Sequence, residues 1–96
     1  MGQTWVDVPE AVVFALRANG GDGRALHFAV RLPRTGDARL ELLDIAGRRV
    51  QSLDLSSLSV GEHTVSLPVG ERAAGIYWAR LSQGDHMLST KVAVVR

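Results

Sequence analysis

The sequence predicts an all-β fold, an immunoglobulin-like β-sandwich of about seven antiparallel strands. Three observations carry this prediction. Apolar and polar residues alternate with period two in successive segments, turn-forming residues separate these segments about every 10 to 13 residues, and no segment has convincing helical periodicity. A chain of 96 residues has room for one hydrophobic core. We therefore assign residues 1–10 to a lead-in or linker and residues 11–96 to a single domain.

The opening strand is expected within residues 11–18. Val12, Val13 and Phe14 favour extended structure, although one helical turn is the alternative for this segment. Residues 19–23 (Asn-Gly-Gly-Asp-Gly) follow, and we expect them to form a flexible turn that ends the strand.

The next two strands are expected at residues 24–32 and 38–45. One side of the first carries four apolar residues, Leu26, Phe28, Val30 and Leu32. Pro33 lacks a backbone donor and stops the ladder before a turn. The second strand repeats the alternation, with Leu40 and Leu42 set between Arg39 and Glu41.

Residues 44–48 predict a tight hairpin leading into a strand at 50–55. Asp44 can accept hydrogen bonds from the turn backbone, and Gly47 can take the positive φ that a type I turn with a bulge requires. Arg48 is expected to lie on the outside of this turn.

Three more strands are expected at residues 62–69, 75–81 and 86–95. Pro68 places the far end of the first at an edge or a terminus, since proline cannot donate to a ladder. In the second, both faces are apolar, with Tyr77 on one side and Trp78 on the other, so we expect a central, covered strand. We expect both aromatic side chains in the core and regard Trp5 as the better candidate for exposure.

Composition and charge exclude several classes of function. The net charge of +1 gives no electrostatic footprint for nucleic acid or an acidic membrane, and no apolar run approaches the roughly 20 residues of a membrane span. Without cysteine, neither a disulfide nor a thiolate metal site can form. We expect neither nucleic acid nor membrane insertion among the interactions of this chain.

No arrangement of catalytic or ligand-binding residues stands out. His27, His63 and His86 lie on three separate segments without the spacing of a zinc set, and residues 19–23 lack the closing glutamate of a calcium loop. The serines occur outside any nucleophile-elbow pattern, and the carboxylates occur singly. We predict a non-enzymatic module without metal or cofactor.

Several motifs occur together and in order: Leu40-x-Leu42-Leu43-Asp44-x-x-Gly47-Arg48-x-Val50, Gly61-x-His63-x-Val65, Gly75-Ile76-Tyr77-Trp78-Ala79-Arg80-Leu81 and Thr90-Lys91-Val92. This pattern resembles the type A C-terminal sorting domain of type IX secretion substrates, and it is similar to the Ig-like domain of the flagellar hook-capping protein. The chain departs from the family at Asn19-Gly20, where Asn-Pro is usual, and at Leu43, where an aromatic residue is common.

The resemblance implies a secretion address on a larger exported bacterial protein. Its recognition element would be the last strand, with Lys91, Thr90, Val92 and Val94, and its structural motif would be Asp44, Gly47, Arg48, Gly75 and Tyr77. The implied partners are outer-membrane translocation machinery and an N-terminal cargo domain of the parent chain. The implied location is the periplasm in transit, then the cell surface or the medium.

Two other functions fit the residues. The first is a structural or assembly module, either of the hook-cap type or an accessory domain of a secreted hydrolase. The second is a carbohydrate-binding module, which predicts that Trp5 or Trp78 is exposed and that its fluorescence responds to a glycan.

Overall fold

The computed structural model describes residues 14–21, 24–70 and 74–95. The lead-in 1–10 and the start of the predicted opening strand lie outside these ranges. Seven β-strands make up the regular structure of the described part: β1 Ala15–Gly21, β2 Ala25–Leu32, β3 Ala38–Leu43, β4 Arg49–Asp54, β5 Gly61–Pro68, β6 Gly75–Gln83 and β7 His86–Val94.

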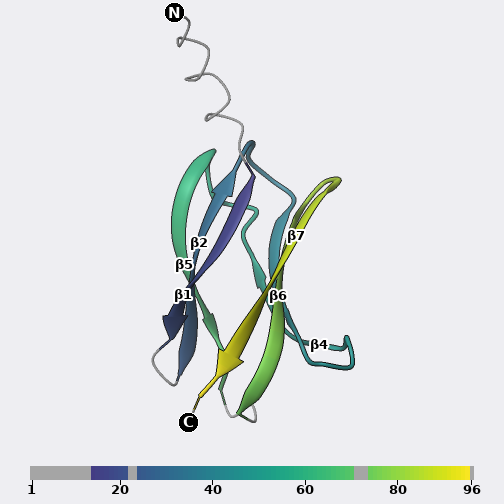
Figure 1. Ribbon diagram of the computed structural model, residues 1–96. Coiled ribbons are helices and arrows are strands. Elements are labelled where there is room, and N and C mark those ends of the chain that lie inside the picture. Colours follow the sequence, from purple (N-terminus) through teal and green to yellow (C-terminus); the bar gives the residue numbers. More distant parts are fainter. Residues whose placement is uncertain (1–13, 22–23, 71–73, 96) are drawn as a thin grey trace, which may run out of the picture.

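The strands form two antiparallel sheets that face each other (Figure 1). One sheet has the order β1-β2-β5 and the other the order β4-β3-β6-β7. The chain therefore changes sheet between β2 and β3, between β4 and β5, and again between β5 and β6. This is an immunoglobulin-like β-sandwich, as the sequence predicts.

The core lies between the sheets and comes from the alternation seen in the sequence. Phe28 and Leu32 of β2 are fully buried. They belong to the same core cluster as Leu40 and Leu81 of the other sheet. Leu40 and Leu81 are themselves direct cross-strand partners. Burying side chains of this size stabilises the fold by roughly 1.5–3 kcal/mol each.

The first strand differs from the prediction at its end. Residues 19–21 belong to β1 and do not begin a turn, because Gly20 takes a φ of +89° inside the strand and the pairing with β2 shifts between Ala18 and Gly21. An Asn-Gly pair can serve either a turn or a bulge, since glycine has no Cβ to oppose positive φ. Here the bulge lets the strand continue.

The environment of β6 also differs from the prediction. The strand is central, between β3 and β7, but only one of its faces is covered. Ile76 is 46% exposed and Trp78 is 40% exposed, because no described element packs on the outer side of the four-stranded sheet. By contrast, the prediction for Pro68 is confirmed, since it is the last residue of β5, an edge strand.

Candidate interaction surface

The last strand, β7, is an edge of the four-stranded sheet. It pairs with β6 over nine residues without a register shift, and no described strand pairs with its other side. In an antiparallel ladder, roughly half of the backbone N–H and C=O groups of an edge strand point away from its neighbour. The outer edge of β7 therefore takes part in no sheet ladder of the described structure, although β1 of the other sheet contacts β7. Figure 1 shows β7 beside β6.

The four predicted recognition residues divide between two faces of β7. Val92 and Val94 are buried in the core, and Thr90 on the same face is half-buried. Lys91 is exposed on the outer face. A partner could therefore contact Val92 and Val94 only through their backbone groups, whereas it could also contact the side chain of Lys91.

Lys91 lies beside the exposed indole of Trp78. The two residues are cross-strand partners on β7 and β6, and the Lys91 Nζ lies 5.9 Å from the ring centroid, which is a cation–π distance. Lys91 forms no ion pair with any described residue. Its charge is therefore available to an anion brought by another molecule.

The prediction that both aromatic residues of β6 lie in the core is wrong for Trp78. Tyr77 is buried in the core, but neighbouring residues of a strand point to opposite faces, so Trp78 points outward. Trp5, the other candidate for exposure, lies outside the described residues.

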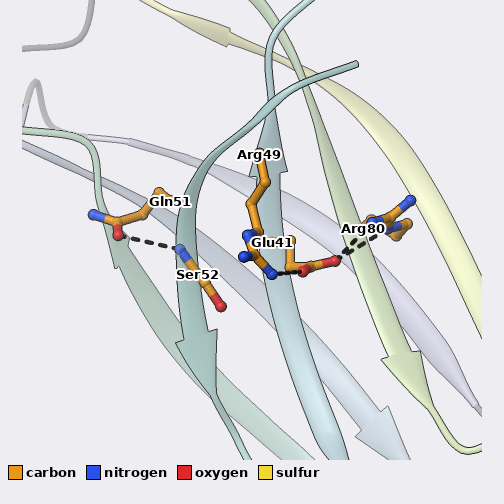
Figure 2. Close-up of polar contacts among 5 residues, drawn as sticks. All are labelled: Glu41, Arg49, Gln51, Ser52 and Arg80. Atoms are coloured by element: carbon orange, nitrogen blue, oxygen red, sulfur yellow. Dashed lines mark hydrogen bonds and ion pairs between the residues drawn. The ribbon is translucent and has the colours of Figure 1, made fainter.

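A cluster of charged side chains occupies the same outer face, and the sequence analysis did not predict it. Glu41 of β3 is only 8% exposed at its side chain and accepts from Arg80 Nη2 at 2.9 Å and from Arg49 Nη1 at 3.1 Å (Figure 2). Burial by itself would raise the pKa of the Glu41 carboxyl, but the hydrogen bonds and charges of Arg80 and Arg49 outweigh it and lower the pKa. Glu41 thus stays ionised while it is screened from water.

A polar hollow of about 390 Å³ opens over part of this cluster. Its lining includes Arg39 and Arg80 together with Glu41, Asp54 and Asp37, so charges of both signs meet there. Hydrogen bonds from Ser56 and the nearby charge of Arg39 lower the pKa of Asp54. With its charges largely matched, the hollow favours neither an anion nor a cation.

The turn between β3 and β4 has the arrangement predicted from the sequence. Asp44 Oδ1 accepts from the backbone N–H groups of Ala46 and Arg48, both at 2.9 Å, and Gly47 has a φ of +86°. Arg48 Nε donates to Asp44 Oδ2 at 3.1 Å. These bonds, led by the one from the Arg48 backbone, lower the pKa of Asp44. One carboxylate thus accepts three of the hydrogen bonds of this turn.

Gly75, the other predicted structural glycine, begins β6 with a φ of +149°. This value lies in the region that L side chains rarely adopt. Gly75 thereby sets the direction in which β6 enters the sheet, two residues before Tyr77 enters the core.

The three histidines lie apart, as the sequence predicts, and each contacts a different residue. His27 Nδ1 is 2.9 Å from Ser66 Oγ across β2 and β5, His63 Nε2 donates to the Ser59 carbonyl at 2.7 Å, and the His86 ring lies 5.1 Å from that of Phe14. The His27–Ser66 pair sits on an open sheet face. No group of three or more potential metal ligands occurs within the described ranges.

Comparison with known proteins finds no family model that matches the chain, and no curated protein or solved structure matches it either. The described part of the chain contains no helix long and apolar enough to cross a membrane. The candidate surface consists of the β7 edge, the Lys91–Trp78 pair and the neighbouring Glu41 cluster.

Proposed function

We propose that this domain is a non-catalytic sorting signal of a larger exported bacterial protein, recognised through its last strand by outer-membrane translocation machinery. The observation that carries the proposal is that β7 is a regular sheet edge with an exposed lysine at its middle. The motif pattern around Asp44, Gly47, Gly75 and Lys91 resembles that of type IX sorting domains and supports the same function.

Recognition by strand addition explains how so small a surface can specify an address. A partner strand laid along β7 pairs with backbone groups that water otherwise satisfies, and the alternating side chains supply selectivity. The domain would pass through the periplasm with its cargo and deliver it to the cell surface or the medium.

The test uses the chain fused to the C-terminus of a periplasmic reporter in a bacterium that has type IX secretion. Deleting β7 is uninformative, because Val92 and Val94 belong to the core. Two single substitutions, Ser89→Pro and Thr90→Pro, avoid this difficulty. Neighbouring residues of an antiparallel strand direct their N–H groups to opposite sides, so one proline removes a bond to β6 and the other removes only an edge donor.

Thermal unfolding of the isolated chain identifies the edge proline as the less destabilising of the two. We expect the reporter with the edge proline to stay in the periplasm in a folded state. The matched controls are Thr64→Pro and Val65→Pro in β5, the edge strand of the other sheet, again selected by unfolding. Export of the β7 edge variant at the wild-type level contradicts the proposal and favours a structural or assembly module.

A carbohydrate-binding module is the second candidate, favoured by the exposure of Trp78. In a Trp5→Phe background, Trp78 is the only tryptophan, so its fluorescence reports on this surface alone. A saturable shift with a soluble glycan supports this candidate if Trp78→Phe abolishes retention on the same glycan in affinity electrophoresis. Unchanged emission across neutral, basic and uronic-acid oligosaccharides removes it.

A further inference from the structure

We infer that the β7 edge binds an extended peptide segment that carries an acidic residue opposite Lys91 and apolar residues on the side facing the sandwich. This inference rests on the proposed function, in which β7 is the recognition element, and it assigns the chemistry of the partner.

The four edge strands of the sandwich differ in regularity. The ladder between β1 and β2 shifts between Ala18 and Gly21, and the ladder between β3 and β4 shifts between Leu42 and Leu43. The remaining edges, β5 and β7, have unbroken ladders. β5 ends in proline, whereas β7 contains none. Since bulges and prolines protect an edge from pairing, β7 is the edge best suited to accept a strand.

The side chains of β7 then indicate the chemistry of that strand. On the outer face, Lys91 is flanked by the small residues Ser89 and Ala93, and Trp78 borders it on the β6 side. The open side is therefore the direction from which an anion can approach the ammonium group. A residue directly opposite Lys91 on an added strand would place its Cβ about 4.5–5.5 Å from that of Lys91, within range for a cross-strand ion pair.

The opposite face of β7 favours apolar partners. Leu88 is 38% exposed although it points to the core side, and Thr90 is half-buried. The Phe14 ring packs against His86 on this same face, and alternate residues of an added strand would lie beside that apolar contact. The expected ligand is therefore amphipathic with period two, apolar on one side and acidic at the position facing Lys91.

A second copy of the chain is a poorer occupant of the same edge. Antiparallel pairing of two β7 strands about Thr90 would set Lys91 of each copy opposite Ser89 of the other. The two Lys91 residues would then be diagonal neighbours, about 7–8 Å apart, with no anion between them. Like charges at this distance oppose the pairing, so the charge pattern favours a different, acidic chain.

The test measures binding of three capped nine-residue peptides of alternating valine and threonine that differ only at the central position, Glu, Gln or Lys. Lys91 is the only lysine in the sequence, so reductive ¹³C-methylation labels it and the N-terminal amine alone. The Lys91 signal is the one that is missing from the spectrum of Lys91→Arg. Titrating each peptide into the labelled full chain gives its Kd and shows whether the Lys91 signal shifts.

We expect the Glu peptide to bind about three- to fivefold more tightly than the Gln peptide, and the Lys peptide to bind most weakly. Lys91→Glu should reverse this order in fluorescence titrations, and high salt should reduce the differences. Arg17→Glu on β1 is the matched control, because it makes the same charge change on another exposed edge residue and should leave the order intact.

Equal binding of the three peptides, or no binding, overturns the inference. Concentration-dependent dimerisation that the edge proline abolishes also overturns it, in favour of a second copy. If the edge proline blocks export while the peptides do not discriminate, the proposed function stands and this inference fails. If the three peptides bind with the predicted order of affinity while the edge-proline reporter is exported normally, this inference stands and the proposed sorting function fails.

Discussion

The outer faces of the two sheets both carry cross-strand ion pairs, but in different surroundings. On the three-stranded sheet, Arg31 and Glu62 meet at 3.0 Å with side chains 37% and 52% exposed. On the four-stranded sheet, Glu41 contacts two arginines at similar distances and is 8% exposed. Glu62 is on an edge strand, whereas Glu41 is on β3, between β4 and β6. The position of a glutamate in the sheet, more than its residue type, decides how exposed its carboxylate is. It thereby decides how much the ion pairs of that carboxylate contribute to stability.

The largest effect is expected from Glu41→Gln. We predict a loss of about 1–3 kcal/mol in the free energy of unfolding, because the substitution removes the charge that holds Arg49 and Arg80, although both guanidinium groups still reach water. Urea unfolding at neutral pH measures this. If Glu41→Gln loses no more free energy of unfolding than Glu62→Gln, the predicted difference between the two faces is wrong.

The pH dependence of the stability of Glu41→Gln tests the same comparison. The folded-state pKa of Glu41 is lowered from its ordinary value of 4.5, so its contribution is present above that pH and is lost as pH falls through the lowered value. The wild-type advantage over Glu41→Gln should therefore shrink below about pH 4.5. Asp44 and Asp54 also have lowered pKa values, but they are present in both proteins and cancel in the difference. An advantage that persists to the acid limit would contradict this assignment.

A smaller effect is expected on the three-stranded sheet. A double-mutant cycle with Arg31→Gln and Glu62→Gln should give a coupling of about 0.2–1 kcal/mol, since both side chains remain in water. About 1 M salt should remove most of it. A coupling that equals the Glu41 effect and resists salt would show that the two faces are alike.

The smallest effect on stability is expected from Lys91→Met in a Trp5→Phe background. Losing the cation–π contact costs about 0.5–1 kcal/mol, but the methionine stem and sulfur can still pack against the ring, so the net change should be close to zero. Trp78 fluorescence should nevertheless change, because the ammonium group leaves the indole. Identical emission spectra would place Lys91 away from the ring in solution.

The fold was largely predictable because its signals are local. Alternation placed Phe28 and Leu40 in the core, and the Asp44 turn follows from a carboxylate and a glycine three residues apart. Such patterns reflect contacts within one strand or one turn. Strand ends were predicted within one or two residues, except for the first strand, which was expected within residues 11–18 and spans Ala15–Gly21.

The candidate surface was only partly predictable because it depends on distant pairing. Glu41 meets Arg80 across 39 residues of sequence, and nothing local sets that register. The apolar character of Trp78 indicated a covered position, but coverage depends on whether another element packs on that face. For Lys91, the sequence indicated a role, while its place beside Trp78 required the β6–β7 register.

The order of strands within the sheets also bears on how fast the chain folds. β2 must find β5, as in the Phe28–Val65 pair, and β3 must find β6, as in the Leu40–Leu81 pair. Among the described strands, only the hairpins β1–β2, β3–β4 and β6–β7 join strands adjacent in the chain. Long loops must therefore close before the centre of either sheet forms, which for sandwiches of this type means milliseconds to seconds. Until the sheet centres form, the apolar faces of the strands lack a shared core and are open to other chains.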